Sequence, residues 1–358
     1  MKKNILDNKT EILKLDSKNM LGSIELLGEQ VSEVWKAAKQ IKMPADYKKI
    51  ANVVVVGMGG STLGAHLIKE LYKDNLKVPI DIVNHYKVPV SVDGKTLVIA
   101  SSYSGTTEEA ISAARDARAK KAKIAAICSG GTLAQWAKMN GIPALVFPTE
   151  FNPCGSPRMG LGYSIFGQLA ILTRAGLLKI SESEIAEALK TILKFQRQFG
   201  VDSREEANTA KKFARGLLGR SVWYVASEHL SGNAHIAANQ MNENAKRFAG
   251  HFIIPELNHH LMEGMLFPKT NKENIRFVLI ESELYDTRVQ KRYAITREVL
   301  DKNGIGWLAY KCVEKSALAQ VCEVLMLGSY ISYYSAILQG IDPTAIPFVD
   351  FFKAQLKK

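Results

Sequence analysis

The sequence predicts an α/β protein with two doubly wound parallel sheets, helices on both faces of each sheet, and an N-terminal helical extension. Short continuous apolar runs such as Val53–Val56 are typical of strands buried on both faces. These runs alternate with segments of helical periodicity, which favours a parallel sheet covered by helices. The alternation restarts near residue 220, so a chain of 358 residues is expected to contain two such units.

The composition is that of a folded globular chain. Hydrophobic residues make up 47% and charged residues 23%, which excludes disordered, collagen-like and disulfide-scaffold proteins. The longest uncharged stretch, 324–340, contains serines and tyrosines, so we expect a buried helix rather than a membrane span. No signal peptide is visible, and the four cysteines are scattered. We therefore expect a cytoplasmic protein with reduced thiols.

The chain is basic, with 47 Lys and Arg against 35 Asp and Glu, a formal net charge of +12. The lysines are spread along the chain, and short runs such as Lys120-Lys121 do not alternate with aromatic residues as in a nucleic-acid platform. We expect neither a nucleic-acid nor a membrane partner. A solvated basic surface would also attract an anionic small molecule, and charge alone does not choose between these interpretations.

The first part of the chain is predicted as an extension over 1–45 and a domain over 46–185. Residues 10–40 show helical spacing, and Pro44 ends that segment. The domain's strands are expected at Val53–Val56, 79–83, 96–100, 124–127 and 144–147. Its helices are expected at 63–72, 108–119, 133–139 and 163–177.

A second domain is predicted over 205–358, after a boundary near 185–215. Helices are expected to fill 182–216 before its first strand. Its strands are expected at 222–226, 275–280 and 306–310, and its helices at 234–248, 288–301, 318–338 and 348–358. Because both domains open with a strand, a turn and a helix, they are predicted to be two copies of one fold.

A glycine-rich segment, Gly57–Gly64, follows the first strand and opens a helix. Its glycines permit a sharp turn, and the N–H groups at the start of the helix can hold an anion. The dinucleotide fingerprint needs a third glycine where Thr62 stands and an acidic residue where Asn84 follows the next strand. A nicotinamide dehydrogenase is therefore disfavoured, and a simple tight turn remains the alternative.

Clustered hydroxyls, Ser101–Thr107, follow the strand at 96–100, where a doubly wound sheet binds ligands. Ser102, Ser104 and Thr107 could donate to phosphate oxygens together with the helix amides. The alternative is helix capping, with Thr106 as the N-cap and Glu109 as its capping-box partner. Capping uses one hydroxyl of the cluster, so the pattern favours phosphate binding.

Two polar segments in the second domain also contain candidate catalytic or metal-binding residues. Glu243 lies in a predicted helix and by itself would be read as a solvated acid. His259 and His260 follow a short apolar run, but adjacent histidines without partners at suitable spacing do not make a zinc site. No metal is expected there.

Together these segments resemble the sugar isomerase (SIS) superfamily and, within it, the bifunctional phosphoglucose/phosphomannose isomerases. The resemblance to the superfamily rests on Gly57–Gly64 and Ser102–Glu108. The resemblance to the bifunctional isomerases rests on Asn242–Lys246, Pro255–His259 and a C-terminal lysine. The resemblance runs from about residue 45 to the end. It implies two SIS-type domains in a cytoplasmic homodimer that needs no cofactor. The implied reaction, part of glycolysis and gluconeogenesis, interconverts glucose 6-phosphate, and mannose 6-phosphate, with fructose 6-phosphate through an enediolate.

The resemblance also implies roles for individual residues. Glu243 matches the base that moves a proton between C1 and C2, and Arg158 matches the arginine beside those carbons. His259, supplied by the neighbouring subunit, and Lys353 match the residues that assist ring opening. The residues expected to contact the sugar phosphate are Gly60, Ser61, Ser102, Ser104 and Thr107.

Two positions depart from the family pattern. Thr106 replaces a more usual asparagine, and Arg247-Phe248 stands where a proline-containing stretch often follows the lysine. The loop at 341–348 is expected to influence whether mannose 6-phosphate is accepted. Two alternatives stay open: an isomerase of another sugar phosphate, such as glucosamine 6-phosphate or an arabinose phosphate, and a non-catalytic SIS-type regulator. The regulator would need a DNA-reading helix, and residues 1–45 contain no basic recognition helix.

Overall fold

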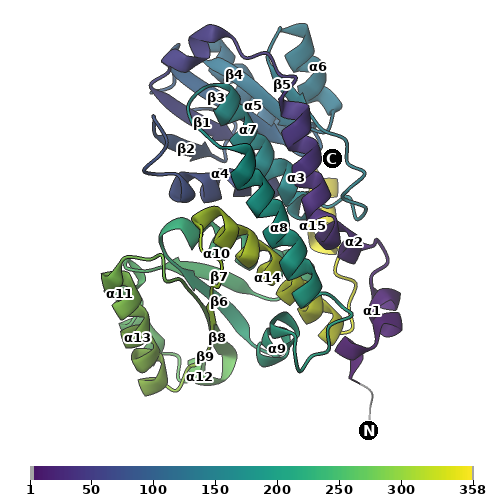
Figure 1. Cartoon of the computed structure of the whole chain (residues 1–358), viewed down its shortest axis with the longest axis vertical. Coiled ribbons are helices and arrows are strands. Elements are labelled where there is room, and N and C mark those ends of the chain that lie inside the picture. The colour runs from purple at the N-terminus through teal and green to yellow at the C-terminus, as the bar shows by residue number, and fades with distance from the viewer. Residues whose placement is uncertain (1–3, 357–358) are drawn as a thin grey trace.

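The computed structural model describes residues 4–356, so the outer ends of the predicted extension and last helix, 1–3 and 357–358, lie outside the described residues. Two α/β units lie one above the other in Figure 1, and the long helix α8 (Glu182–Phe199) runs along both. The predicted class, two parallel sheets with helices on both faces, is confirmed.

The first sheet has five parallel strands in the order β2-β1-β3-β4-β5. Alternate residues of its strand β1 enter two different cores: Val53 and Val55 belong to one apolar cluster, Val54 and Val56 to the other. Burial on both faces explains the unbroken apolar runs. The strands are β1 (Asn52–Val56), β2 (Ile80–Val83), β3 (Thr96–Ser102), β4 (Lys123–Cys128) and β5 (Ala144–Val146). The helices of this unit are α4 (Gly60–Leu71), α5 (Glu108–Ala119), α6 (Gly131–Met139) and α7 (Gly167–Arg174).

The second sheet repeats this order with four parallel strands, β7-β6-β8-β9. Its edge strand β7 (Ala249–Ile253) was not among the predicted strands, because it mixes Gly250 and His251 with apolar residues and is only partly buried. The other strands are β6 (Ser221–Ala226), β8 (Ile275–Glu281) and β9 (Gly306–Lys311). The helices are α9 (Thr209–Gly216), α10 (Ser231–Asn244), α11 (Leu257–His260), α12 (Asn271–Asn274), α13 (Thr287–Lys302), α14 (Ala317–Leu338) and α15 (Pro347–Leu356).

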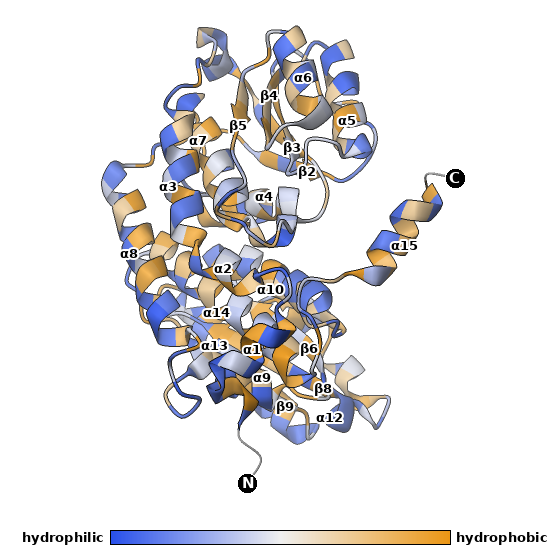
Figure 2. Ribbon diagram, turned by 90° about the vertical axis from the view of Figure 1, so that its right-hand side faces the viewer, coloured by the Kyte–Doolittle hydropathy of each residue, from blue (hydrophilic) through white to orange (hydrophobic). Residues whose placement is uncertain are grey.

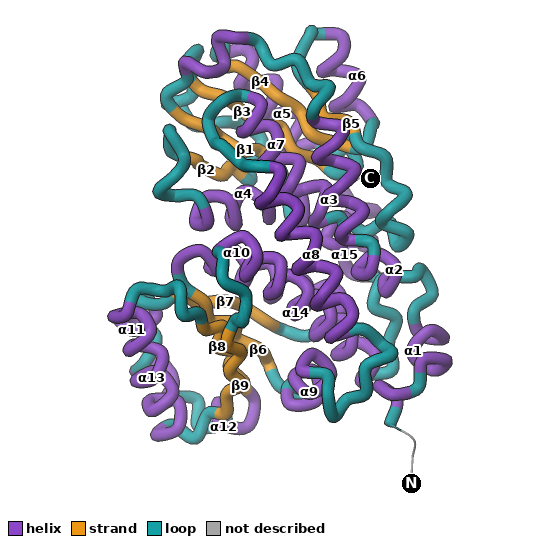
Figure 3. The backbone as a smooth tube through the Cα atoms, viewed as in Figure 1, coloured by secondary structure: helices purple, strands orange, loops and turns teal. Residues whose placement is uncertain are grey.

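Helix α14 is the apolar segment expected to be a buried helix, and this is confirmed. Within residues 4–356 it is the one helix long and apolar enough to cross a membrane, yet 94% of its apolar window is buried inside the protein. Figure 3 shows it beneath α10 in the middle of the molecule. It therefore serves as a core helix on which the second unit packs.

The extension is not one helix but three: α1 (Lys9–Leu15), α2 (Met20–Glu25) and α3 (Leu27–Ala38). The break before α2 comes from Asp16, whose carboxylate accepts the N–H groups of Met20 and Leu21 at 2.7 and 2.8 Å. Such side-chain bonds to the free amides of a first turn start a new helix. Gly22 lies inside α2 and does not interrupt it.

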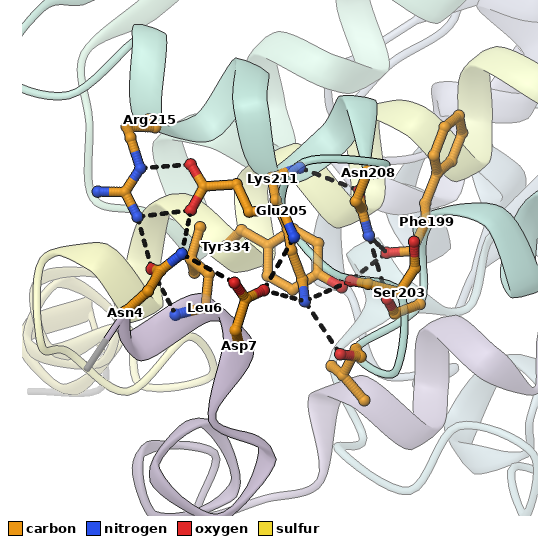
Figure 4. Close-up of polar contacts among 12 residues, drawn as sticks. Asn4, Leu6, Asp7, Phe199, Ser203, Glu205, Asn208, Lys211, Arg215 and Tyr334 are labelled. Atoms are coloured by element: carbon orange, nitrogen blue, oxygen red, sulfur yellow. Dashed lines mark hydrogen bonds and ion pairs between the residues drawn. The ribbon is translucent and has the colours of Figure 1, made fainter.

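The extension contacts both units instead of standing apart from them. Figure 4 shows its first residues against the start of α9: Lys211, which is fully buried, lies 3.4 Å from the Asp7 carboxylate, and Arg215 donates to Asn4 at 2.7 Å. On α3, the Gln30 amide donates to the carbonyl of Phe151 at 2.9 Å, beside the first sheet. The extension thus ties the two units together.

Other helices begin or end at different residues from those predicted. The segment expected at 163–177 begins as a π-helical turn, η4 (Gly162–Phe166), before α7, and the segment expected at 182–216 is two helices, α8 and α9. Helix α10 stops at Asn244 instead of Phe248, because Lys246 adopts a left-handed conformation with φ +50°. The short 3₁₀ segments are η1 (Ile5–Asp7), η2 (Ala45–Lys49), η3 (Pro157–Met159), η5 (Glu228–Leu230) and η6 (Glu263–Leu266).

Candidate active site

The glycine-rich turn between β1 and α4 brings two chain segments into close contact. Gly59 has φ +49°, a conformation that glycine adopts without steric cost, and α4 begins at the next residue. A Cβ on Gly60 would lie 2.8 Å from the carbonyl carbon of Pro157 and 3.0 Å from the amide nitrogen of Arg158. The absence of a side chain at Gly60 therefore lets the first turn of α4 lie directly against Arg158.

The hydroxyl loop after β3 is held by its own side chains. Ser102 Oγ accepts the N–H of Gly105 at 3.1 Å and donates to Thr107 Oγ1 at 3.0 Å, while Ser104 and Thr106 are hydrogen-bonded at 2.9 Å. The neighbouring loop joins it, because the Tyr103 N–H donates to Ser61 Oγ at 2.9 Å. The five residues expected to hold phosphate thus lie at the adjoining carboxyl ends of two paired strands.

The capping alternative for this loop is wrong. The N-cap of α5 is Thr107, not Thr106, and its side chain makes no capping hydrogen bond. Thr106 instead bonds to Ser104 across the tight turn at Gly105, which has φ +69°. The first-turn amides of α5 are therefore left without a side-chain acceptor, the arrangement in which a helix N-terminus can accept an anion.

Arg158 is buried, with 2% of its surface exposed, and neighbouring groups fix its guanidinium in place. Its Nε donates to Asn244 Oδ1 at 2.6 Å. Its Nη2 donates to the carbonyls of Pro343 and Thr344 at 3.2 and 2.9 Å, in the loop after α14. Burial lowers the pKa of this guanidinium, and the charge of Glu243 opposes that shift. A buried arginine so held presents a fixed positive charge.

Glu243, near the end of α10, faces Arg158. Its Oε2 lies 3.3 Å from Arg158 Nη1, and its side chain keeps 36% of its surface exposed. The structure thus brings together Arg158, Glu243 and the glycine-rich turn. A carboxylate beside a fixed cation, open on one side, can take up and return a proton while the cation stabilises a developing negative charge.

Sequence reasoning missed the side chains that support this pair. Asn244 Nδ2 donates to Ser332 Oγ and Gln240 Nε2 donates to Ser329 Oγ, each at 3.0 Å, so α10 is fixed to α14 beside Arg158. The available signal was the spacing of Gln240 and Asn244, four residues apart and therefore on one face of the same helix. Buried amides at that spacing need partners on a neighbouring element.

Lys246 adds a second cation close to this pair. Its ammonium donates to the carbonyls of Asn244 and Asp342 at 3.0 and 2.6 Å. Burial first, and then the charge of Arg158, lowers the pKa of Lys246 to about 8. Sequence reasoning had used this lysine as part of a motif and had assigned it no role.

The structure does not bring His259 or Lys353 to Glu243 within one chain. Both side chains are exposed, on α11 and α15, and Figure 3 shows these helices on opposite sides of the molecule. Among the hydrogen bonds and ion pairs of residues 4–356, none joins either residue to Arg158 or Glu243. The roles expected for His259 and Lys353 therefore depend on a second chain or on a movement of α15.

The comparisons with known proteins agree with this architecture. Residues 206–356 match the family model of the bacterial phospho-glucose isomerase C-terminal SIS domain. A bifunctional phosphoglucose/phosphomannose isomerase of Caldicellulosiruptor bescii is 33% identical over 94% of this chain and 98% of its own length. One of the same description from Thermoplasma volcanium is 28% identical over 88% of this chain and 96% of its own.

Another relative carries a different description. A D-glucosamine-6-phosphate 4-epimerase of Sulfolobus acidocaldarius is 29% identical over 65% of this chain and 71% of its own. Among solved structures, a hypothetical protein from Thermus thermophilus superimposes with a TM-score of 0.71 at 18% identity, covering 97% of this chain and 92% of its own. This last likeness concerns the fold alone.

Proposed function

The chain belongs to the family of bifunctional phosphoglucose/phosphomannose isomerases, and from this we propose that it interconverts glucose 6-phosphate and mannose 6-phosphate with fructose 6-phosphate. The observation that carries the proposal is the pairing of Arg158 with Glu243 at 3.3 Å, beside a glycine that lets the phosphate-binding turn approach Arg158. The proposal takes Glu243 as the base and Arg158 as the fixed cation, with the loops after β1 and β3 holding the distant phosphate.

In the proposed reaction, Glu243 is the general base. Its carboxylate removes the proton from C2 of the open-chain aldose, or from C1 of the ketose, and returns it to the adjacent carbon. The electron pair of the broken C–H bond forms the C1–C2 double bond, the π electrons of the carbonyl move to its oxygen, and Arg158 stabilises the negative charge of the resulting enediolate. A proton passes between O1 and O2 before the adjacent carbon is reprotonated, so the carbonyl ends on the other carbon. No net oxidation occurs, because one carbon is oxidised as the other is reduced. General base catalysis of this kind contributes about 10²–10⁴-fold.

The phosphate is proposed to bind where the loops after β1 and β3 meet. The neutral donors proposed to hold it are the hydroxyls of Ser104 and Thr107 and the first-turn amides of α4 and α5. The positive ends of both helix dipoles add to the attraction. Gly60, Ser61 and Ser102 shape this surface. Because the phosphate lies away from the reacting carbons, its binding energy serves to orient them over Glu243.

Ring opening is proposed to require a second copy of the chain, with His259 of one copy acting in the site of the other. Helix α15, which carries Lys353, supports an association of chains. It has no buried residue and projects from the body of the protein in Figure 2, with Phe348, Phe351 and Phe352 exposed by 86, 63 and 62%. A ten-residue helix is marginal on its own, so it needs a surface to cover those rings.

A coupled assay of purified, EDTA-treated protein with fructose, glucose and mannose 6-phosphates tests the proposal. Turnover among all three is expected. Glucosamine 6-phosphate belongs in the same assay, because the match to an epimerase of that sugar favours it as the second candidate substrate. Turnover of that sugar alone would replace the proposal, and binding of sugar phosphates without any turnover would favour the regulator.

A further inference from the structure

A basic hollow of about 460 Å³ lies at the end of the second sheet where its strands begin. Arg220 and Ser221 lie at the start of β6, and Lys246 to Phe248 connect α10 to β7. The hollow is lined by Gly219, Arg220, Ser221, Lys246, Arg247, Phe248, Asn274 and Gln339. This lining contains three cations and no carboxylate.

The three cations of the basic hollow form no ion pair among residues 4–356, although the charges of Asp342 and Glu243 act on Lys246. Arg247 is only 6% exposed, yet its guanidinium bonds to neutral oxygens alone, the carbonyl of Leu217 and the amide oxygen of Gln339. Lys246 likewise bonds only to backbone carbonyls. Arg220 makes no side-chain hydrogen bond or ion pair within the described chain. Since a guanidinium carries five N–H groups and an ammonium three, several donors remain for a ligand.

A structural explanation of these charges is that they compensate helix ends. Helices α10 and α14 both end beside the basic hollow, and Gln339 is the C-cap of α14. Each helix C-terminus carries about half a negative charge. Two such ends amount to roughly one charge, and the carboxylates of Asp342 and Glu243 also act on Lys246, against the three cations of the hollow and the nearby Arg158. An uncompensated positive potential therefore remains.

We propose that the basic hollow is a second anion site, which binds a small polyvalent anion such as a phosphate ester or a polyphosphate. None of its lining residues belongs to the set proposed for the sugar phosphate. Arg220 provides the planar fork that suits a phosphate group, and Arg247 and Lys246 provide charge.

Calorimetric titration of the full chain with sodium pyrophosphate tests this site. The Ser104→Ala/Thr107→Val variant, which weakens the proposed sugar-phosphate loop, is expected to keep pyrophosphate binding in the basic hollow. Arg220→Gln on that background should weaken binding about tenfold or more, and Arg220→Lys should fall between the two. Lys179→Gln, a matched loss of charge at an exposed lysine elsewhere, should bind as its parent does.

Three results would overturn the proposal: loss of all pyrophosphate binding in the Ser104→Ala/Thr107→Val variant, equal binding with and without Arg220, or equal weakening by Lys179→Gln. Arg220 is partly exposed, so its variants are expected to fold, and thermal unfolding checks this. The titration needs no turnover. The titration can therefore be interpreted even if the isomerase proposal fails.

Discussion

The guanidinium of Arg158 and the carboxylate of Glu243 approach to 3.3 Å although 85 residues separate them in the chain. Arg158 follows the first sheet, and Glu243 lies on a helix of the second unit. Their contact depends on the packing of α4 against α10, where a Cβ on Gly232 would collide with the backbone of Leu67. The proposed active site therefore forms only when the two units are docked.

Glu243→Gln is expected to lower kcat by about a hundredfold or more, because an amide cannot take up the proton. Its oxygen can still accept from Arg158, so the fold and the affinity for fructose 6-phosphate should change little. The coupled assay and a binding titration measure both effects. Glu298→Gln, at an exposed position of α13, should retain the parental rate. A parental rate in Glu243→Gln would remove this residue from the mechanism.

Gly60→Ala is expected to raise KM and lower kcat together, by about tenfold or more in kcat/KM. The added Cβ would lie 2.8 Å from the carbonyl carbon of Pro157, so the glycine-rich turn, proposed to bind phosphate, must move away from Arg158. Gly94→Ala is the control, because a Cβ there meets its nearest atom at 3.6 Å. It should behave as the parent does. Unchanged kinetics in Gly60→Ala would show that this close approach does not matter for turnover.

Three histidines at the junction of the two units are expected to make stability depend on pH. His66 on α4 packs edge-on against His235 on α10, with ring centroids 4.5 Å apart, and His235 stacks on His251 of β7 at 4.6 Å. Burial lowers the pKa of all three, and that of His235 falls to about 4, with the charges of its two neighbours adding to the shift. The folded state therefore keeps these rings neutral below the pH at which they protonate in the unfolded chain.

The sign follows from proton binding. Between about pH 6.5 and 4 the unfolded state binds more protons, so the free energy of unfolding falls as the pH falls. The slope is at most ~1.4 kcal/mol per pH unit for each proton, and less because the rings are partly exposed to solvent. Urea unfolding at pH 7 and pH 5 should show a smaller difference for His235→Gln than for the parent. His85→Gln, at an exposed position, should keep the parental difference.

Mixing two inactive variants tests whether the site is shared between chains. If His259 acts in the site of a second copy, a heterodimer of Glu243→Gln and His259→Ala contains one intact site. Random exchange of equal amounts makes about half of the dimers mixed, so about a quarter of the parental activity should return. Two Glu243 variants mixed together should stay inactive. No recovery after proven subunit exchange would place His259 in its own chain's site or outside the mechanism.

Much of the architecture could be predicted because the signals are local. Apolar runs with strand length, alternating with helical periodicity, indicated eight of the nine strands within residues 4–356 and their parallel direction, but not the order of the strands. The missed strand β7 lies at an edge, where partial burial allows Gly250 and His251. The position of the hydroxyl loop could also be predicted, because its polar residues directly follow a buried strand. Its capping interpretation failed because a hydroxyl's partner depends on turn geometry, which residue types do not specify.

The sequence by itself determined the two repeated α/β units, the hydroxyl-rich loop after β3 and the family resemblance, because periodicity and motif spacing are recorded along the chain. Only the tertiary structure decided that Asn244 and the carbonyls of Pro343 and Thr344 hold Arg158 against Glu243, and that Lys246 and Arg247 share a hollow with Arg220. The physical reason is that these contacts join segments distant in sequence. Their energy depends on distance and burial, and both arise only once the helices and sheets have packed.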